Sequence, residues 1–229
     1  MSANKTEEEV KQQVIDKMGE KLGSLYHALW KELLWLNIKW REYVELFGTN
    51  PSRIEVLDRA AGRFFVVVEI TLWEDTLLHI ARLTDSSETG SKKNLTIQKL
   101  LSLIREDGFK KELSKLNDIA VMKADFCKDW RNRYIAHRDL ELATQKGVIL
   151  LKSASRSQVQ EVLDSLSNVL NAVSDHYLIN PTEFNDRGEP GDAVSLLDIL
   201  YDGLQAEDER NERIKNGIYR EEDYRSRGF

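Results

Sequence analysis

Apolar side chains recur in steps of mostly three and four residues from Val10 to Phe47. This spacing places them on one side of an α-helix, because 3.6 residues complete a helical turn. The pattern therefore predicts one long helix, bent near Gly19 or Gly23. Its apolar members are Val10, Val14, Met18, Leu22, Leu25, Leu29, Leu33, Leu36, Trp40 and Phe47.

Three further stretches carry the same helical spacing, and few residues interrupt them. The 229 residues include only 3 Pro and 12 Gly, too few turn-forming residues for a sandwich or barrel of many short strands. With 41% apolar residues, the chain is long enough for one sizeable core. We therefore expect an all-α protein, an antiparallel bundle of four main helices with additional short helices. The apolar stripes that mark the other three main helices run over 57–83, 113–134 and 159–177.

Local signals mark where the second and fourth helices begin. Asn50 is placed to cap the second helix, with Pro51 as its first residue. Ser157 and Gln160 have the spacing of a capping box at the start of the fourth. Inside the second helix, residues 64–68 are rich in β-formers and taken alone suit a buried strand. The helical flanks of this run favour a helix.

The segments between the main helices are less regular. The polar residues 84–94 predict a loop, and Asn94 is placed to cap a short helix over 95–104 that Gly108 closes. Residues 141–156 join the third and fourth helices, and their short apolar run suits either a hairpin or an irregular crossover. Connections this short favour antiparallel neighbours in a bundle.

The helical pattern breaks near residue 180, where Asn-Pro and then a Gly-containing polar run follow. We expect a helical bundle domain over 1–180 and an acidic C-terminal extension over 181–229. The extension is predicted to contain a helix over 193–204, followed by a solvated helix or frayed tail. Residues 183–229 hold 13 acidic and 7 basic residues, whereas the other residues balance at 26 and 26. The net charge of −6 therefore leaves room for a basic site on the main body.

Cysteine usage and the N-terminal sequence bear on location. Cys127 is the only cysteine, which excludes an intramolecular disulfide, and no paired Cys or His spacing suits a structural zinc. The first residues lack the apolar segment of a signal peptide, and no run is apolar enough to span a membrane. We expect a cytoplasmic protein that is not associated with a membrane and that binds no metal or cofactor. Cys127 itself is expected to be a buried, inert thiol, because it lies on the apolar side of its helix.

The most informative segment lies at the end of the third predicted helix, where Arg131, Arg133, His137 and Arg138 fall within eight residues. Residues 123–138 contain five Lys or Arg against two Asp, which makes this a locally basic place. In a regular helix, Arg133 and His137 lie about 40° apart, but Arg131 and His137 lie about 120° apart. A site that uses Arg131 with His137 therefore requires the helix to end or bend before His137, or a second copy of the motif from another subunit.

Arg131, Asn132 and His137 resemble the R-x(4–6)-H signature of the HEPN superfamily, in which the residue after the arginine is commonly polar. The wider sequences ARLTDSSETGSKKNLTIQKLL at 81–101 and WRNRYIAHRDL at 130–140 resemble the abortive-infection, AbiU-like branch of that superfamily. The resemblance covers roughly residues 20–178 and leaves out the acidic extension.

The resemblance implies a metal-independent endoribonuclease that acts in phage defence or as a toxin. Two copies of the chain would form a homodimer with their motifs facing each other, and an antitoxin protein is a further candidate partner. Attack of a ribose 2′-hydroxyl on the adjacent phosphate makes RNA the substrate. His137 would act as general base or acid, and Arg131 would stabilise the charge that develops on the phosphate. Asn132, Arg133 and Arg138 would bind or orient the substrate.

Two other interpretations of the same residues stay open at this stage. His137 also continues the apolar line of Phe126, Trp130 and Tyr134, so it suits a hydrogen-bonded histidine at the edge of the core. The arginines suit helix-end cations that pair with neighbouring aspartates. The alternative function is a non-catalytic helical module that keeps the HEPN shape and binds RNA or a partner protein.

Overall fold

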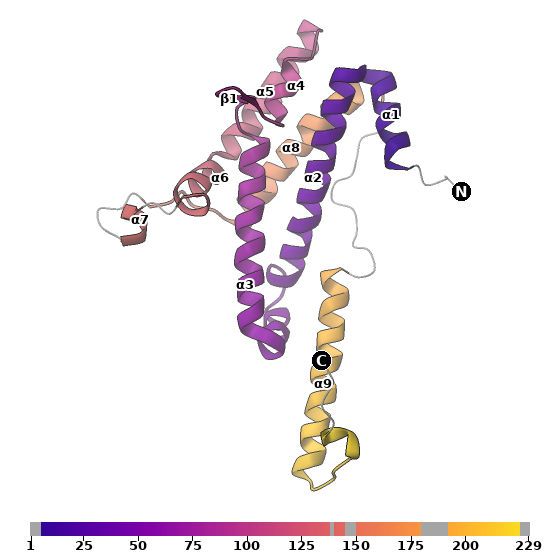
Figure 1. Cartoon of the computed structure of the whole chain (residues 1–229), viewed down its shortest axis with the longest axis vertical. Helices are drawn as coiled ribbons and strands as arrows, with labels where there is room; N and C mark the ends of the chain where they lie inside the picture. Colours follow the sequence, from indigo (N-terminus) through magenta and orange to yellow (C-terminus); the bar gives the residue numbers. More distant parts are fainter. Residues whose placement is uncertain (1–5, 138–139, 145–149, 180–191, 225–229) are drawn as a thin grey trace. The chain divides into compact units, whose positions relative to one another are not determined.

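A computed structural model of the chain describes residues 6–137, 140–144, 150–179 and 192–224 (Figure 1). This part of the chain is largely helical, which confirms the all-α prediction. In chain order its elements are α1 (Glu7–Met18), α2 (Glu20–Phe47), α3 (Pro51–Leu83), β1 (Glu88–Thr89), β2 (Lys92–Lys93), α4 (Ile97–Leu101), α5 (Asp107–Lys123), α6 (Asp125–Trp130), the π-helical turn η1 (Arg131–Ile135), α7 (Leu140–Thr144), α8 (Arg156–His176), α9 (Ala193–Lys215) and the 3-10 turn η2 (Glu221–Tyr224).

Helices α2 and α3 lie side by side and run antiparallel (Figure 1). Near the middle of α2, a carboxylate oxygen of Glu32 lies 2.8 Å from Nε2 of His79, which is late in α3. Further along α2, the ring centroids of Trp40 and Trp73 are 6.2 Å apart. Residue numbers therefore rise on one helix as they fall on the other.

Helices α5 and α8 form the second antiparallel pair. His176 Nε2 lies 3.3 Å from a Glu106 carboxylate oxygen at one end, and Lys123 Nζ lies 3.6 Å from Glu161 at the other. The Trp40 indole donates a 2.9 Å hydrogen bond to the Gln160 side chain, which joins α2 to α8. The core between the helices contains fully buried aliphatic side chains from all four: Leu29, Leu33, Leu36, Leu77, Ile80, Leu113, Leu163, Leu166 and Leu170.

The chain divides into two compact units. One comprises Met1–Arg41 and Leu72–Asp186, and the other comprises Glu42–Thr71 and Arg187–Phe229. The second unit has its own apolar cluster, formed by Leu46, Leu57, Phe65, Ala193 and Leu197.

The helix α9 supplies part of that second cluster and makes polar contacts with the rest of the unit at two points. The Ala193 N–H donates a 2.7 Å hydrogen bond to Glu42, and the Arg59 guanidinium contacts both carboxylate oxygens of Asp208 at 2.8 and 2.9 Å. The predicted helix in the extension is confirmed and is longer than expected, because it continues to Lys215. A domain boundary at residue 180 stays a prediction and falls outside the described residues.

Gly19 separates α1 from α2, so the single bent helix predicted over this stretch is wrong. Its φ of +79° lies in the left-handed region, which a residue without a Cβ adopts at little cost. Gly23 has a different role, since a Cβ placed there would lie 2.7 Å from the Ile15 Cα. The close approach of α1 to α2 therefore depends on the missing side chain at Gly23.

Helix α3 begins at Pro51, as predicted, and the Asn50 side chain accepts a 3.0 Å hydrogen bond from the Ser52 N–H. Residues 64–68 lie within this helix, which confirms the helical interpretation over the strand. One feature was not predicted: the backbone of Ala61, with φ −165° and ψ 59°, interrupts the helical geometry.

Several local expectations are wrong, each because another hydrogen-bonding arrangement forms. The capping box of α8 consists of Ser155 and Gln158, two residues earlier than the predicted box, so the helix begins at Arg156. The side chain of Asn94 does not cap α4 but closes the loop before it, where β1 and β2 pair as a small hairpin. Gly108 lies inside α5 instead of closing the preceding helix.

The third predicted helix is divided at Ala124. That residue has φ −81° and ψ 1°, so α5 ends at Lys123 and α6 begins at Asp125. In the connection to α8, residues 145–149 lie outside the described residues, so the choice between a hairpin and a crossover stays open. None of the described helices combines the length and apolar character that crossing a bilayer requires.

A group of charged side chains surrounds His79, which is 3% exposed, between α2 and α3. Lys39 Nζ donates to His79 Nδ1 at 3.1 Å, and Lys39 also pairs with Asp75. Glu32 contacts His79 on the other ring nitrogen, and Arg82 lies 3.5 Å from Glu32. Burial, followed by the charge of Lys39, lowers the pKa of His79 to about 4, so the folded protein holds this imidazole neutral.

Replacing Gly23 with Ala is expected to destabilise the protein by about 1–3 kcal/mol, because the new methyl group meets the α1 backbone and forces the helices apart. Thermal unfolding measures the change. Gly203→Ala is the matched control, since nothing lies within 4 Å of a Cβ at this position in α9 and Ala is the better helix former. Equal melting temperatures for wild type and Gly23→Ala would contradict the close approach.

The neutral His79 predicts that stability falls as pH drops from about 6.5 to about 4. In this window the unfolded chain binds a proton at His79 that the folded chain does not, so acid favours unfolding, by up to about 3 kcal/mol at the lower end. Urea unfolding at several pH values tests this against His79→Gln, whose amide keeps both hydrogen-bonding roles without titrating. Parallel pH profiles for the two proteins would refute the assignment.

Candidate functional site

The motif predicted to carry the chemistry lies where regular α-helix ends. After α6, residues 131–135 form one π-helical turn, in which the Ala136 N–H donates a 2.8 Å hydrogen bond to the Arg131 carbonyl. An α-helix would pair residue 135 with residue 131, so this turn holds one extra residue. π-helical turns are rare in proteins, and those that do occur are often found at functional sites.

The chain bends immediately after this turn, at Ala136 and His137. On a straight α-helix Arg131 and His137 would lie about 120° apart. The wide turn and the bend remove that constraint, which meets the condition for using the two side chains together. The His137 side chain is exposed and is not buried against Trp130 or Tyr134, as the structural interpretation of this histidine required.

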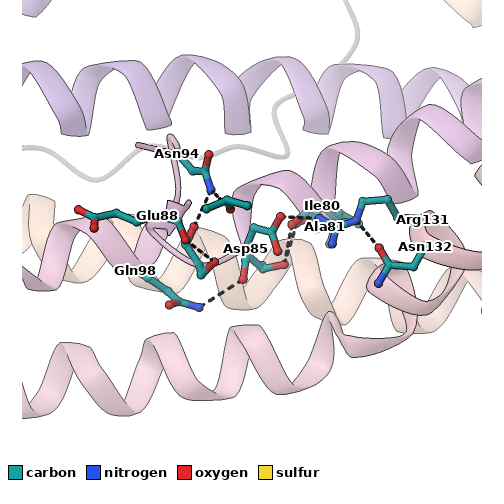
Figure 2. Close-up of polar contacts among 11 residues, drawn as sticks. Ile80, Ala81, Asp85, Glu88, Asn94, Gln98, Arg131 and Asn132 are labelled. Atoms are coloured by element: carbon teal, nitrogen blue, oxygen red, sulfur yellow. Dashed lines mark hydrogen bonds and ion pairs between the residues drawn. The ribbon is translucent and has the colours of Figure 1, made fainter. Parts of the chain in front are cut away.

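Arg131 is held from two sides (Figure 2). Its Nη1 donates to a carboxylate oxygen of Asp85 at 2.5 Å, and its Nε donates to the Asn132 side-chain oxygen at 3.0 Å. The Arg131 side chain is 22% exposed and that of Asp85 is 29% exposed, so the pair lies at the surface without being fully solvated. The structure therefore brings Asn132 to Arg131, and adds Asp85.

Asp85 follows the last turn of α3, and its neighbours fix the backbone around it. The Thr84 hydroxyl donates to the Ile80 carbonyl at 2.9 Å, and the Gln98 amide donates to the Thr84 carbonyl at 3.4 Å. The Asn94 side chain closes the loop by donating to the Ser86 carbonyl at 3.0 Å (Figure 2). Asp85 is thus presented by an ordered loop.

Asp85 was not among the residues predicted for the site. Charge alone gives no reason to choose it among 39 acidic residues, and it lies 46 positions from Arg131. A signal was nevertheless available, because the segment 81–101 that carried the family resemblance contains it.

Arg133 lies on the same turn but is engaged by the protein itself. It is 3.6 Å from Asp129, one turn earlier, and donates to the Leu150 carbonyl at 3.4 Å. Asp129 also accepts a 2.8 Å hydrogen bond from the Lys152 N–H, while the Trp130 indole donates to the Lys152 carbonyl at 2.9 Å. These contacts anchor the motif helix to the segment before α8. The fifth predicted site residue, Arg138, lies outside the described residues.

The other three histidines have structural surroundings. His79 lies in the charged group between α2 and α3, and His27 is buried and stacks on Trp30 at 5.9 Å, with its pKa lowered chiefly by burial. His176 stacks on Phe109 at 3.9 Å. Within the described ranges no group of three or more His, Cys, Asp or Glu side chains is arranged to hold a metal ion.

Cys127 is fully buried in α6, four residues before Arg131. Burial raises the pKa of its thiol strongly, because the thiolate would be desolvated in these apolar surroundings. The thiol therefore stays protonated and does not supply a nucleophile to the neighbouring motif.

Comparison with known proteins gives one family. The family model described as AbiU2, of the HEPN group, matches residues 19–194 and so includes the π-turn, His137 and the Asp85 loop. No curated protein and no solved structure matches the chain.

The buried Cys127 is expected to resist alkylation in the folded protein, since neither the thiolate nor access for the reagent is available. Mass spectrometry after iodoacetamide treatment should show less than about 1% of the rate found in urea, where the chain is unfolded. Rapid labelling without denaturant would show that α6 opens or that the thiol is exposed.

Proposed function

We propose that this chain, which belongs to the AbiU2 family of the HEPN superfamily, is a metal-independent endoribonuclease acting in abortive infection against phage or as a toxin. The observation that carries the proposal is the geometry at the end of the motif helix. Regular helix stops at Arg131, and His137 follows a bend with its side chain exposed.

The chemistry follows from the two groups. His137 takes the proton from a ribose 2′-hydroxyl, and the 2′-oxygen attacks the adjacent phosphorus. The bond from phosphorus to the 5′-oxygen breaks, and that oxygen receives a proton, which leaves a 2′,3′-cyclic phosphate and a 5′-hydroxyl. The Arg131 guanidinium stabilises the additional negative charge on the phosphate oxygens in the transition state. Asn132 orients Arg131, and Arg133 and Arg138 hold flanking phosphates.

The proposal includes a homodimer, because one imidazole cannot take the proton from the 2′-hydroxyl and donate a proton to the 5′-oxygen at the same time. His137 of a second copy then serves as the acid. Exposed apolar side chains on α3 support self-association: Phe64, Val67 and Ile70 are 61%, 58% and 51% exposed.

A second candidate function is a non-catalytic module that binds RNA or a protein. The ion pairs of Arg131 with Asp85 and of Arg133 with Asp129 favour it, because cations at a helix end that pair with neighbouring carboxylates are a common structural arrangement that requires no catalysis. In this case the motif end of the helix would bind phosphates or acidic side chains without cleaving RNA.

His137→Ala is expected to lower RNA cleavage by at least about 100-fold, since it removes the proton-transferring group. Purified protein is incubated with mixed RNA in excess chelator, and the new ends are mapped for cyclic phosphate. Expression in cells adds a second readout, as the substitution should also remove growth toxicity.

His176→Gln is the matched control, because this histidine stacks on Phe109 outside the motif. It should cleave RNA as wild type does. Full activity of a folded His137→Ala protein would overturn the catalytic proposal. RNA binding by wild type without cleavage would favour the module.

A further inference from the structure

We propose that Asp85 is a positioning residue of the site, which orients the Arg131 guanidinium toward the substrate phosphate. The inference rests on the proposed function and deepens it by adding a residue from a segment far away in the sequence. The observation behind it is the two-sided hold on Arg131, by Asp85 at Nη1 and by Asn132 at Nε.

The geometry of the guanidinium decides which donors remain. Arginine presents five N–H groups in one plane. Asn132 occupies the Nε donor and Asp85 accepts from Nη1 only, so the contact with the carboxylate is not bidentate. Among the described residues, Nη2 has no hydrogen-bond partner, and the side chain is 22% exposed. An incoming phosphate oxygen can therefore bind Nη2 without displacing either contact.

Two acceptors on different nitrogens also fix the plane of the group. With Asn132 alone, the guanidinium can still change its tilt through the long side chain, because Asn132 is its neighbour in the chain and moves with it. Asp85 lies on a separate element, after α3, so it supplies an external reference point. Misplacement of a catalytic group by about 1 Å can cost a hundredfold in rate.

The loop that carries Asp85 is built to keep its position (Figure 2). The Thr84 hydroxyl bonds back to the buried last turns of α3, and the Gln98 amide connects the loop to α4. The Asn94 side chain spans the loop to the Ser86 carbonyl and the Thr89 hydroxyl, at 3.0 and 2.8 Å. The backbone on both sides of Asp85 is thus restrained by hydrogen bonds, which limits the positions that its side chain can take.

The test is a double-mutant cycle on RNA cleavage with Asp85→Ala, Arg131→Ala and the pair. Asp85→Ala should lower kcat by about 10- to 100-fold and change KM by less than about threefold, because the lost contact acts on the orientation of a transition-state group. In the Arg131→Ala background it should lower kcat no further. An additional loss of similar size in that background would overturn the inference, since Asp85 would then act independently of Arg131.

Asp85→Asn provides the rescue arm. Its amide oxygen can still accept from Nη1, so activity should stay within about threefold of wild type. Activity as low as that of Asp85→Ala would overturn positioning by hydrogen bonding. Glu88→Ala is the control for an acidic side chain on the same loop, as Glu88 is paired with Lys99 at 3.6 Å, and it should leave kcat unchanged.

An NMR measurement separates the inference from the proposed function. The side-chain Nη–Hη resonances of Arg131, assigned by their loss in Arg131→Ala, should be resolved and slow to exchange in wild type and Asp85→Asn but averaged in Asp85→Ala. If wild type does not cleave RNA, the nuclease proposal fails while this signal still reports on Asp85. If wild type cleaves but Asp85→Ala leaves both the signal and kcat unchanged, the inference fails alone.

Discussion

Burial of apolar helix faces is the constraint on which the rest of this structure depends. The four long helices of the bundle each bring leucines to a common core, such as Leu33, Leu77, Leu113 and Leu166. A charged group at the same depth must then be paired or neutralised, because an isolated charge there would cost several kcal/mol. The group around His79 meets this demand by leaving the imidazole neutral between Lys39 and Glu32.

The candidate site lies where this packing requirement ends. The core positions of α6 finish with Phe126 and Cys127, and the backbone leaves α-helical geometry a few residues later, at Arg131. No residue of this turn is fully buried, and polar contacts hold its two arginines. Asp85 and Asn132 hold Arg131, and Asp129 holds Arg133. The contrast between the two regions explains how a stable bundle also carries an accessible cationic turn.

The sequence predicted most of what depends on periodicity and little of what depends on single backbone angles. The helices, the start of α3 at Pro51 and the buried Cys127 follow from apolar spacing and capping chemistry. At Gly19 a bend was expected but not a complete break, and the interruptions at Ala61 and Ala124 were not expected, because apolar spacing continues through each of these positions. For the site, the motif residues were read from a local pattern, whereas Asp85 depends on tertiary contact between distant segments. The roles of Arg131 and His137 stay predictions.

The position of α9 has a practical consequence for how this chain can be shortened. The family match ends at residue 194, the second residue of α9, although Leu197 is a member of the second apolar cluster. A fragment trimmed to the matched limits would expose Leu46, Leu57 and Phe65 to water. Newly exposed apolar surface of this kind favours aggregation. A shortened version of this chain should therefore keep α9, which packs on this cluster, even though most of α9 lies outside the family match.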